Sequence, residues 1–89
     1  MRYHLMVKGK VQGVGYRYFV VTAGKNMGLT GWVRNCSNGD VECEAQGKKI
    51  QLEAFIERLE SGHSWARIDR IEKQEMNEKS EEREFEIAY

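Results

Sequence analysis

The sequence predicts an α+β sandwich in which two helices cover one face of an antiparallel sheet. The spacing of apolar residues switches between the two-residue period of strands and the 3.6-residue period of helices. Glycines stand at these switches and mark the ends of the elements. The resulting order is β-α-β-β-α-β with a short final strand, which is the split βαβ arrangement. A chain of 89 residues fits one domain, which we expect to cover residues 1–89.

The first third of the chain predicts a strand, a glycine-rich loop and a helix. Large apolar side chains occupy every second position over residues 2–8, as in a strand, and glycines punctuate residues 9–15. From residue 16 or 17 to residue 27, apolar residues recur four apart, as on one face of a helix. These residues are Phe19, Ala23 and Met27. Gly28 then stands where helices usually stop.

The rest of the chain predicts four further strands and a second helix. The turn sequence Ser37-Asn38-Gly39-Asp40 joins the first two of these strands into a hairpin. The Glu- and Lys-rich stretch from Glu75 to Glu84 is expected to be a solvated connection. Both helices should then pack on the same face of the sheet, as in ferredoxin-like folds. The expected strands span residues 29–35, 41–46 and 67–74, the helix spans 49–60, and a short strand begins at Phe85.

The register of the hairpin follows from the separation of apolar and charged faces. If Val33 lies opposite Cys43, the apolar residues of both strands share one face, and Arg34 can pair with Glu42 on the other. This register places Cys36 and Cys43 on opposite faces, so we expect two reduced thiols and no disulfide.

Composition and charge exclude several classes of protein. The formal net charge is zero, with 14 basic and 14 acidic side chains, so no general nucleic-acid partner is expected. No apolar run approaches 18 residues, and the N-terminus lacks the apolar segment of a signal peptide, which predicts no membrane partner and a cytoplasmic location. His4 and His63 are isolated from any metal-ligand spacing, so neither a metal site nor a cofactor is expected.

The glycine-rich loop enters a helix that has no Ser, Thr, Asp or Asn at its expected N-cap. The first helical N–H groups therefore need another acceptor, which is either water or an anion such as phosphate. Glycines allow the backbone to wrap closely around an anion. Arg17 falls in the first helical turn, where a cation opposes the helix dipole unless an anion lies between them. The loop alone leaves both readings open, because such turns occur without phosphate.

Asn35 is expected to converge on the same place. The first two strands are joined by a crossover helix, so they run in the same direction and end at the same edge of the sheet. The glycine-rich loop leaves the first strand at that edge, and Asn35 ends the second strand there. The preferred register turns Asn35 toward the helices, where Arg17 begins its helix.

These residues resemble the acylphosphatase family. Its first motif is matched by residues 9–17 (GKVQGVGYR), and its second by residues 31–35 (GWVRN), which continues through residues 39–42 (GDVE). The resemblance covers almost the whole chain. It implies a ferredoxin-like enzyme that needs no metal and hydrolyses the carboxyl–phosphate bond of small acyl phosphates, releasing a carboxylate and inorganic phosphate.

The resemblance also implies roles for particular residues. Arg17 would bind the phosphate and Asn35 would orient the attacking water, while backbone amides would surround the phosphate oxygens. Those amides belong to Gln12, Gly13, Val14, Gly15 and Tyr16. We expect a monomer. The chain departs from the family pattern in three places: Tyr16 stands where Phe is frequent, no proline follows the second helix, and Ala88 stands where Arg is common.

Two functions of other classes remain as alternatives. Ferredoxin-like sheets also build RNA-binding modules, but the aromatic motif of such modules is absent and the net charge is zero. A pure interaction domain would leave the glycine-rich loop without a purpose. RNA binding without hydrolysis would favour the first alternative.

Overall fold

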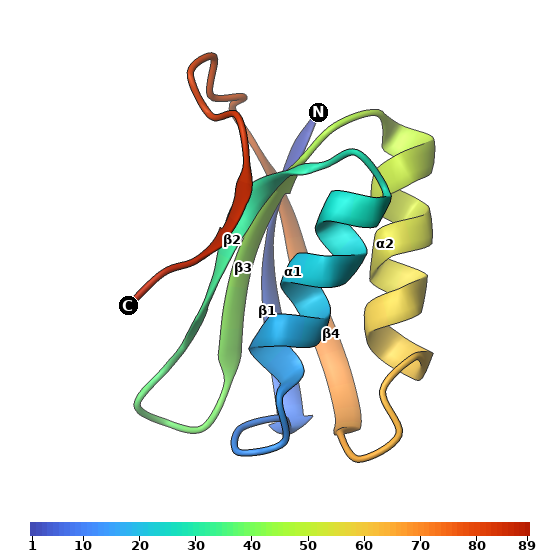
Figure 1. Ribbon diagram of the computed structural model, residues 1–89, viewed down its shortest axis with the longest axis vertical. Coiled ribbons are helices and arrows are strands. Elements are labelled where there is room, and N and C mark those ends of the chain that lie inside the picture. Colours follow the sequence, from blue (N-terminus) through green and yellow to red (C-terminus); the bar gives the residue numbers. More distant parts are fainter.

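The computed structural model describes residues 1–89 and contains the predicted elements in the predicted order. Both helices lie on the same face of a single sheet, and the opposite face carries no helix (Figure 1). The elements are β1 (Arg2–Lys10), α1 (Tyr16–Asn26), β2 (Thr30–Asn35), β3 (Val41–Gln46), α2 (Lys49–Ser61), β4 (Arg67–Met76) and β5 (Phe85–Ile87).

The sheet has the strand order β4-β1-β3-β2-β5, and its first four strands are antiparallel to their neighbours as predicted. The short β5 differs, because it pairs with β2 in parallel and so makes the sheet mixed. The cause is topological. Strand β4 ends at the edge of the sheet where β2 begins, so a chain that crosses only that edge must run along β2 in the same direction (Figure 1).

The predicted hairpin register is confirmed. Val33 lies opposite Cys43, and the guanidinium of Arg34 donates to Glu42 across the strands, with Nε 2.6 Å from Oε1. Cys36 and Cys43 are both free thiols, and burial raises the pKa of Cys43 well above the ordinary thiol value. A thiol held protonated in this way is a poor nucleophile, which fits a structural role for Cys43.

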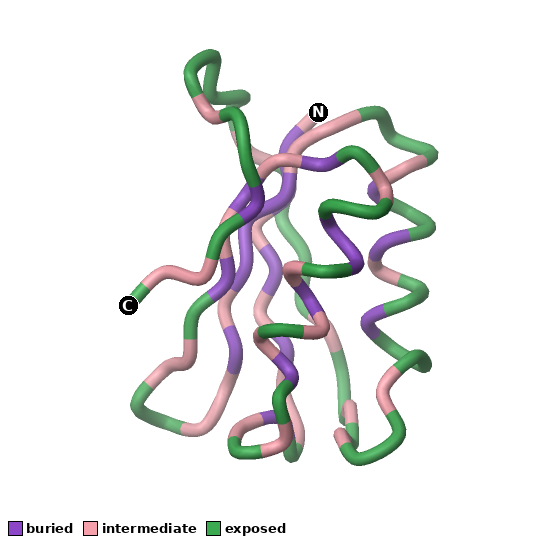
Figure 2. The backbone as a smooth tube through the Cα atoms, in the orientation of Figure 1, coloured by how far each residue is buried: buried purple, intermediate pink, exposed green.

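The core lies between the helices and the sheet, as the burial pattern of Figure 2 shows. Helix α2 contributes Leu52, Phe55 and Leu59, all fully buried and spaced as predicted for one helix face. Helix α1 ends at a Schellman-type motif in which Gly28 adopts a φ of 72° and the amide of Leu29 donates to the carbonyl of Gly24. Residues 11–15 connect the end of β1 to the start of α1.

The edge of the sheet farthest from the glycine-rich loop contains a buried arginine. Arg2 has no exposed surface, and its guanidinium donates to Glu44 (2.9 Å), Gln46 (3.1 Å) and Glu82 (2.7 Å). We call these four residues the Arg2 cluster. The connection after β4 is therefore not wholly solvated as expected, because it folds back to supply Glu82.

The paired arginine changes the acid–base behaviour of that carboxylate. Burial alone would raise the pKa of Glu82, but hydrogen bonds from Arg2 and Thr30, with the charge of Arg2, outweigh it. The pKa of Glu82 therefore lies below its ordinary value, so this carboxylate remains charged near neutral pH. Neither helix has the length and apolar character needed to cross a lipid bilayer.

Candidate active site

The loop between β1 and α1 presents a row of free backbone amides. Gly13 and Gly15 have φ of 79° and 77°, a region that side chains with a Cβ enter only with strain. Gly15 is the N-cap of α1 and, as predicted, no side chain caps the helix. The N–H groups of residues 12–18 donate to no acceptor in the protein; the first bonded amide of the helix is that of Phe19, 3.1 Å from the carbonyl oxygen of Gly15. These amides form a cradle suited to an anion.

The side chain of Gln12 fixes this cradle to the β2–β3 turn. Its Nε2 donates to the carbonyl oxygens of Cys36 and Asp40, at 2.7 and 2.9 Å. Cys36 directly follows Asn35, so the bonds hold the cradle and the end of β2 in a fixed relation. The sequence predicted a role for the backbone of Gln12 and missed the role of its side chain. A glutamine within a loop carries no local signal of a partner that lies 24 or 28 residues away.

Tyr16 anchors the other side of the cradle to α2. Its hydroxyl donates to the carbonyl oxygen of Leu59 at 2.9 Å, and its ring packs against Phe19 and the edge of His63. Burial raises the pKa of Tyr16 far above the ordinary phenol value, so this hydroxyl stays protonated. A phenylalanine at this position could not form this hydrogen bond.

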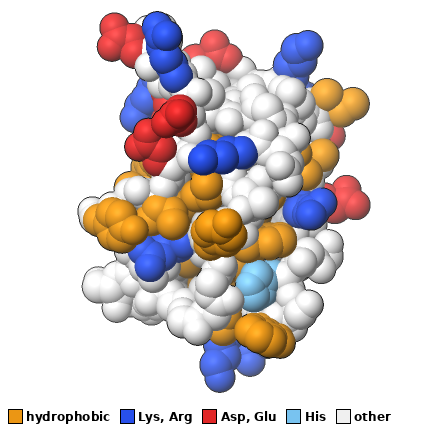
Figure 3. Space-filling model, viewed as in Figure 1, with side chains coloured by type: hydrophobic (Ala, Val, Ile, Leu, Met, Phe, Trp, Pro, Cys, Tyr) orange, Lys and Arg blue, Asp and Glu red, His pale blue; other side chains and the backbone are white.

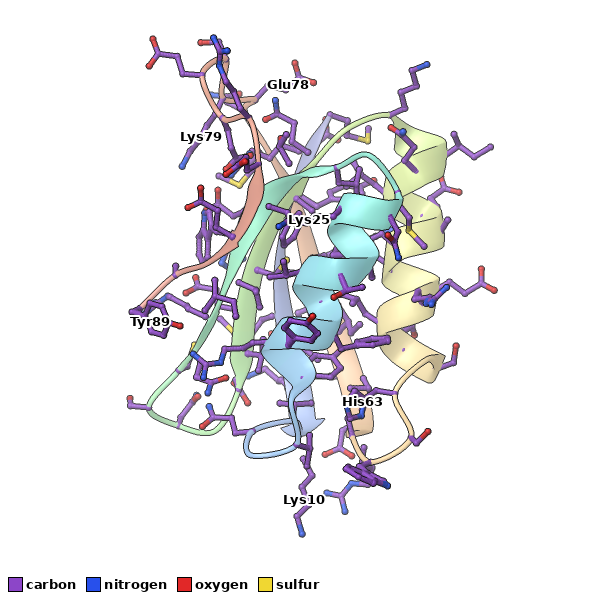
Figure 4. All side chains as sticks on the ribbon, in the orientation of Figure 1. Lys10, Lys25, His63, Glu78, Lys79 and Tyr89 are labelled. Carbon is purple, nitrogen blue, oxygen red and sulfur yellow. The ribbon has the colours of Figure 1, made fainter.

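Arg17 is half-buried in the first turn of α1 and forms no ion pair with any carboxylate. The first turn of the helix also contains no acidic residue. The contact recorded for its guanidinium is with the ring of Tyr89, whose centroid lies 5.7 Å from Cζ. Figure 4 shows Tyr89 at the end of the C-terminal segment, beyond β5. The positive charge of Arg17 is therefore available to a ligand.

The structure brings Asn35 to the same pocket as Arg17, as the topology predicted. The pocket has a volume of about 190 Å³, and its lining includes Gln12, Gly13, Gly15, Arg17 and Asn35. The Oδ1 atom of Asn35 is the one buried side-chain polar atom without a hydrogen-bond partner in the protein. An unpaired buried acceptor typically costs about 1–3 kcal/mol, so we expect Oδ1 to accept a hydrogen bond from a water molecule or a ligand in the pocket.

Of the predicted loop residues, Val14 is the one that does not line this pocket. It is half-buried and packs against the hydrophobic core. Its amide nevertheless belongs to the row of free N–H groups. The loop positions thus contribute through their backbone, which is why apolar and glycine residues suffice there.

Neither histidine belongs to the pocket lining. His4 Nε2 lies 2.6 Å from an oxygen of Glu42 on the face without helices. His63 Nδ1 accepts hydrogen bonds from the amides of Trp65 and Ala66. Both side chains have structural partners.

A larger hollow of about 500 Å³ lies near β5, but its lining is unsuited to an anion. It contains Glu81, Glu82, Glu84 and Glu86 against a single Arg83. The pocket around Arg17, in contrast, has no carboxylate in its lining. Electrostatics therefore favours the smaller pocket as the site for a phosphate group.

Comparisons with known proteins identify the family of this chain. A family model described as acylphosphatase matches residues 3–87. The acylphosphatase of Bifidobacterium longum is 46% identical over 71 residues, which cover 80% of this chain and 73% of that protein. The acylphosphatase of Geobacillus thermodenitrificans is 40% identical over 88 residues, covering 99% and 94% of the two chains. The crystal structure of acylphosphatase from Bacillus subtilis matches with a TM-score of 0.94 at 35% identity, over 99% of this chain and 98% of that one. The chain therefore belongs to the acylphosphatase family, whose members hydrolyse acyl phosphates.

Proposed function

We propose that this acylphosphatase binds the phosphate of its substrate between Arg17 and the free amides of residues 12–16, and that Asn35 orients the attacking water. The observation that carries the proposal is the convergence of an unpaired arginine, unpaired amides and an unpaired Asn35 Oδ1 on one pocket without carboxylates. Each of these groups lacks a partner within the protein and would gain one when an anion and a water molecule bind.

The cradle and Arg17 stabilise charge in the transition state. Phosphoryl transfer spreads negative charge over the equatorial oxygens, and catalysis depends chiefly on positioning and electrostatic stabilisation. The planar guanidinium of Arg17 can bind two of these oxygens at once. The amides are held in place by Gln12 and Tyr16 before substrate binds, so little reorganisation is needed.

Asn35 positions the nucleophile. Its Oδ1 accepts a hydrogen bond from a water molecule, whose oxygen attacks phosphorus in line with the scissile bond. The P–O bond to the acyl group breaks, its electron pair leaves with the carboxylate, and the substrate phosphate accepts the water proton. An amide is too weak a base to take that proton itself. No covalent phosphoenzyme forms, and no metal or cofactor takes part.

The test is hydrolysis of benzoyl phosphate by the wild-type protein, Arg17→Ala and Asn35→Ala, with EDTA present. We expect rapid turnover by the wild type and a loss of roughly 10³-fold or more in kcat/KM for Arg17→Ala. We expect Asn35→Ala to lower kcat by about 10²–10³-fold, as for removal of a transition-state hydrogen bond, with little change in inhibition by inorganic phosphate. Full kcat in Asn35→Ala would contradict the water-positioning role. Isolation of a phosphorylated Cys36 or histidine would contradict direct attack by water.

We further propose that the protein acts as a monomer in the cytoplasm. One chain supplies every residue that lines the pocket, so catalysis needs no second copy. The two unpaired thiols suit a reducing compartment. Light scattering of the purified protein and fractionation of the source cells test these two points.

A further inference from the structure

The apolar part of the pocket lining consists of four residues, Val11, Tyr16, Tyr18 and Ile87. Val11 and Tyr16 are each only 1% exposed, so their side chains belong to the core. Tyr18 is 73% exposed, and Ile87 is half-buried at the end of β5. A ligand in the pocket therefore contacts its apolar wall mainly through Tyr18 and Ile87.

These two side chains come from different elements that meet beside Arg17. Tyr18 follows Arg17 directly in the first turn of α1, and Ile87 lies opposite Val33 on β2 in the parallel pairing with β5. Figure 3 shows hydrophobic side chains gathered in a band across this face, from the C-terminal segment to α1. An apolar surface thus lies next to the predicted phosphate cradle in the same pocket.

An exposed aromatic residue needs no explanation by itself, because single surface hydrophobics are common. Trp65 is 79% exposed and lines none of the pockets described above. Tyr18 differs in that it lines the pocket that also contains Arg17 and the free amides. An acyl phosphate joins such an anion to an organic group, and the organic group must lie within a few ångströms of the phosphate.

We propose that Tyr18 and Ile87 form a subsite for the acyl group, so that the enzyme favours substrates with a flat aromatic or branched apolar acyl group over acetyl phosphate. This inference rests on the function proposed above. The lining contains no cation besides Arg17, which is committed to the phosphate, so acyl groups that carry a second carboxylate gain no partner in the pocket. Apolar contact, at about 25 cal/mol per Å² of buried surface, is what the subsite offers.

The experiment measures kcat/KM for benzoyl phosphate and for acetyl phosphate in the wild type and in Tyr18→Ala. We expect the ratio of the two values to fall by about tenfold in Tyr18→Ala, the effect of losing part of an apolar pocket. The benzoyl-to-acetyl ratio of kcat/KM in the variant is divided by the same ratio in the wild type. The different intrinsic reactivities of the two substrates then cancel. Inhibition by inorganic phosphate should be unchanged, because Tyr18 contributes nothing but its amide to the cradle.

Two further variants sharpen the test. Trp65→Ala removes an equally exposed aromatic residue outside the pocket and should leave the ratio unchanged. Tyr18→Phe keeps the ring and should retain the wild-type ratio, which a role for the hydroxyl would not allow. An unchanged ratio in Tyr18→Ala, or an equal loss on both substrates, would overturn the subsite. If the folded wild type hydrolysed neither substrate, the catalytic proposal itself would fail, and the subsite with it.

Discussion

Two arginines at opposite edges of the sheet have opposite surroundings. Arg2 has no exposed surface and donates to two carboxylates and a glutamine. Arg17 is half-buried, has no carboxylate partner and lies in a pocket without acidic residues. Figure 4 shows the two ends of the sheet, with Glu78 and Lys79 at one end and Lys10 at the other.

The difference lies in whether the protein itself satisfies the charge. The guanidinium of Arg2 donates to side-chain oxygens of Glu44, Gln46 and Glu82. These bonds stabilise the fold and leave the buried charge of Arg2 inaccessible to a ligand. Arg17 lines the same pocket as the unpaired amides and has no carboxylate partner, so positive charge gathers there without an anion from the protein. Burial and pairing together, rather than residue type, separate the structural arginine from the one that we propose binds the substrate.

The most severe way to test this contrast is to remove the buried arginine. Arg2→Ala leaves Glu44 and Glu82 without their cation, and we expect the free energy of unfolding to fall by about 3 kcal/mol. Urea unfolding measures this loss, while kcat per folded molecule should remain near the wild-type value. A variant that keeps its stability but loses activity would reverse the roles assigned to the two arginines.

Acid should weaken the same cluster through its carboxylates. The pKa of Glu82 is lower in the folded protein than in the unfolded chain, so its contribution to stability is complete above the ordinary carboxyl pKa. That contribution is lost as the pH falls through the lowered value. We expect a smaller effect than in Arg2→Ala, because a protonated carboxyl still accepts a hydrogen bond. Urea unfolding from about pH 6 down to about pH 3 measures the decline, and Glu82→Gln should flatten part of it.

A substitution of Gln12 should change the position of the glycine-rich loop while leaving Arg17 in place. Gln12→Ala removes two hydrogen bonds to the β2–β3 turn, and we expect unfolding to become easier by about 1 kcal/mol. The cradle should also lose its fixed relation to Asn35, which lowers kcat and weakens inhibition by phosphate. Gln74→Ala, at an exposed position of β4, is the matched control. Equal kinetics in both variants would show that the cradle keeps its shape without Gln12.

The smallest expected effect has the opposite sign. Arg17→Ala removes a cation from the N-terminus of α1, where it opposes the helix dipole, so the free protein should gain about 0.3–1 kcal/mol. Arg17→Lys, which keeps the charge, should show no such gain. Stability measured without phosphate reveals the difference, and added phosphate should stabilise the wild type more than Arg17→Ala. A loss of stability in Arg17→Ala would show that Arg17 supports the fold.

Local patterns were enough to predict the order of the elements and the pocket that Arg17 and Asn35 share, because the information in these patterns is short-range. The glycines of the loop, the uncapped helix and the register of Val33 opposite Cys43 each follow from a few neighbouring residues. Asn35 could be placed beside Arg17 because strand direction follows from the order of the elements.

The features that were missed depend on contacts between distant residues. Arg2 donates a hydrogen bond to Glu82, which lies 80 residues away in the sequence, and no local pattern near either residue predicts this contact. The parallel pairing of β5 with β2 and the hydrogen bonds of the Gln12 side chain were missed for the same reason. Each joins two segments that lie far apart in the sequence. Apolar periodicity predicts which face of an element is buried, but it does not say which polar partner will lie beside it.

Residues 82–88 connect the end of the sheet at Arg2 to the pocket of Arg17. Glu82 binds Arg2, the amide of Ala88 donates to the carbonyl oxygen of Val33 at 2.8 Å, and Ile87 lies between them in the pocket lining. Because β5 has only three residues, this segment should open as one unit in slow native-state fluctuations. Each opening would separate Glu82 from Arg2 and remove Ile87 from the pocket wall at the same time. Hydrogen exchange at the Ala88 amide therefore reports on both ends of the sheet, and a bound analogue of an acyl phosphate that cannot be hydrolysed should slow it.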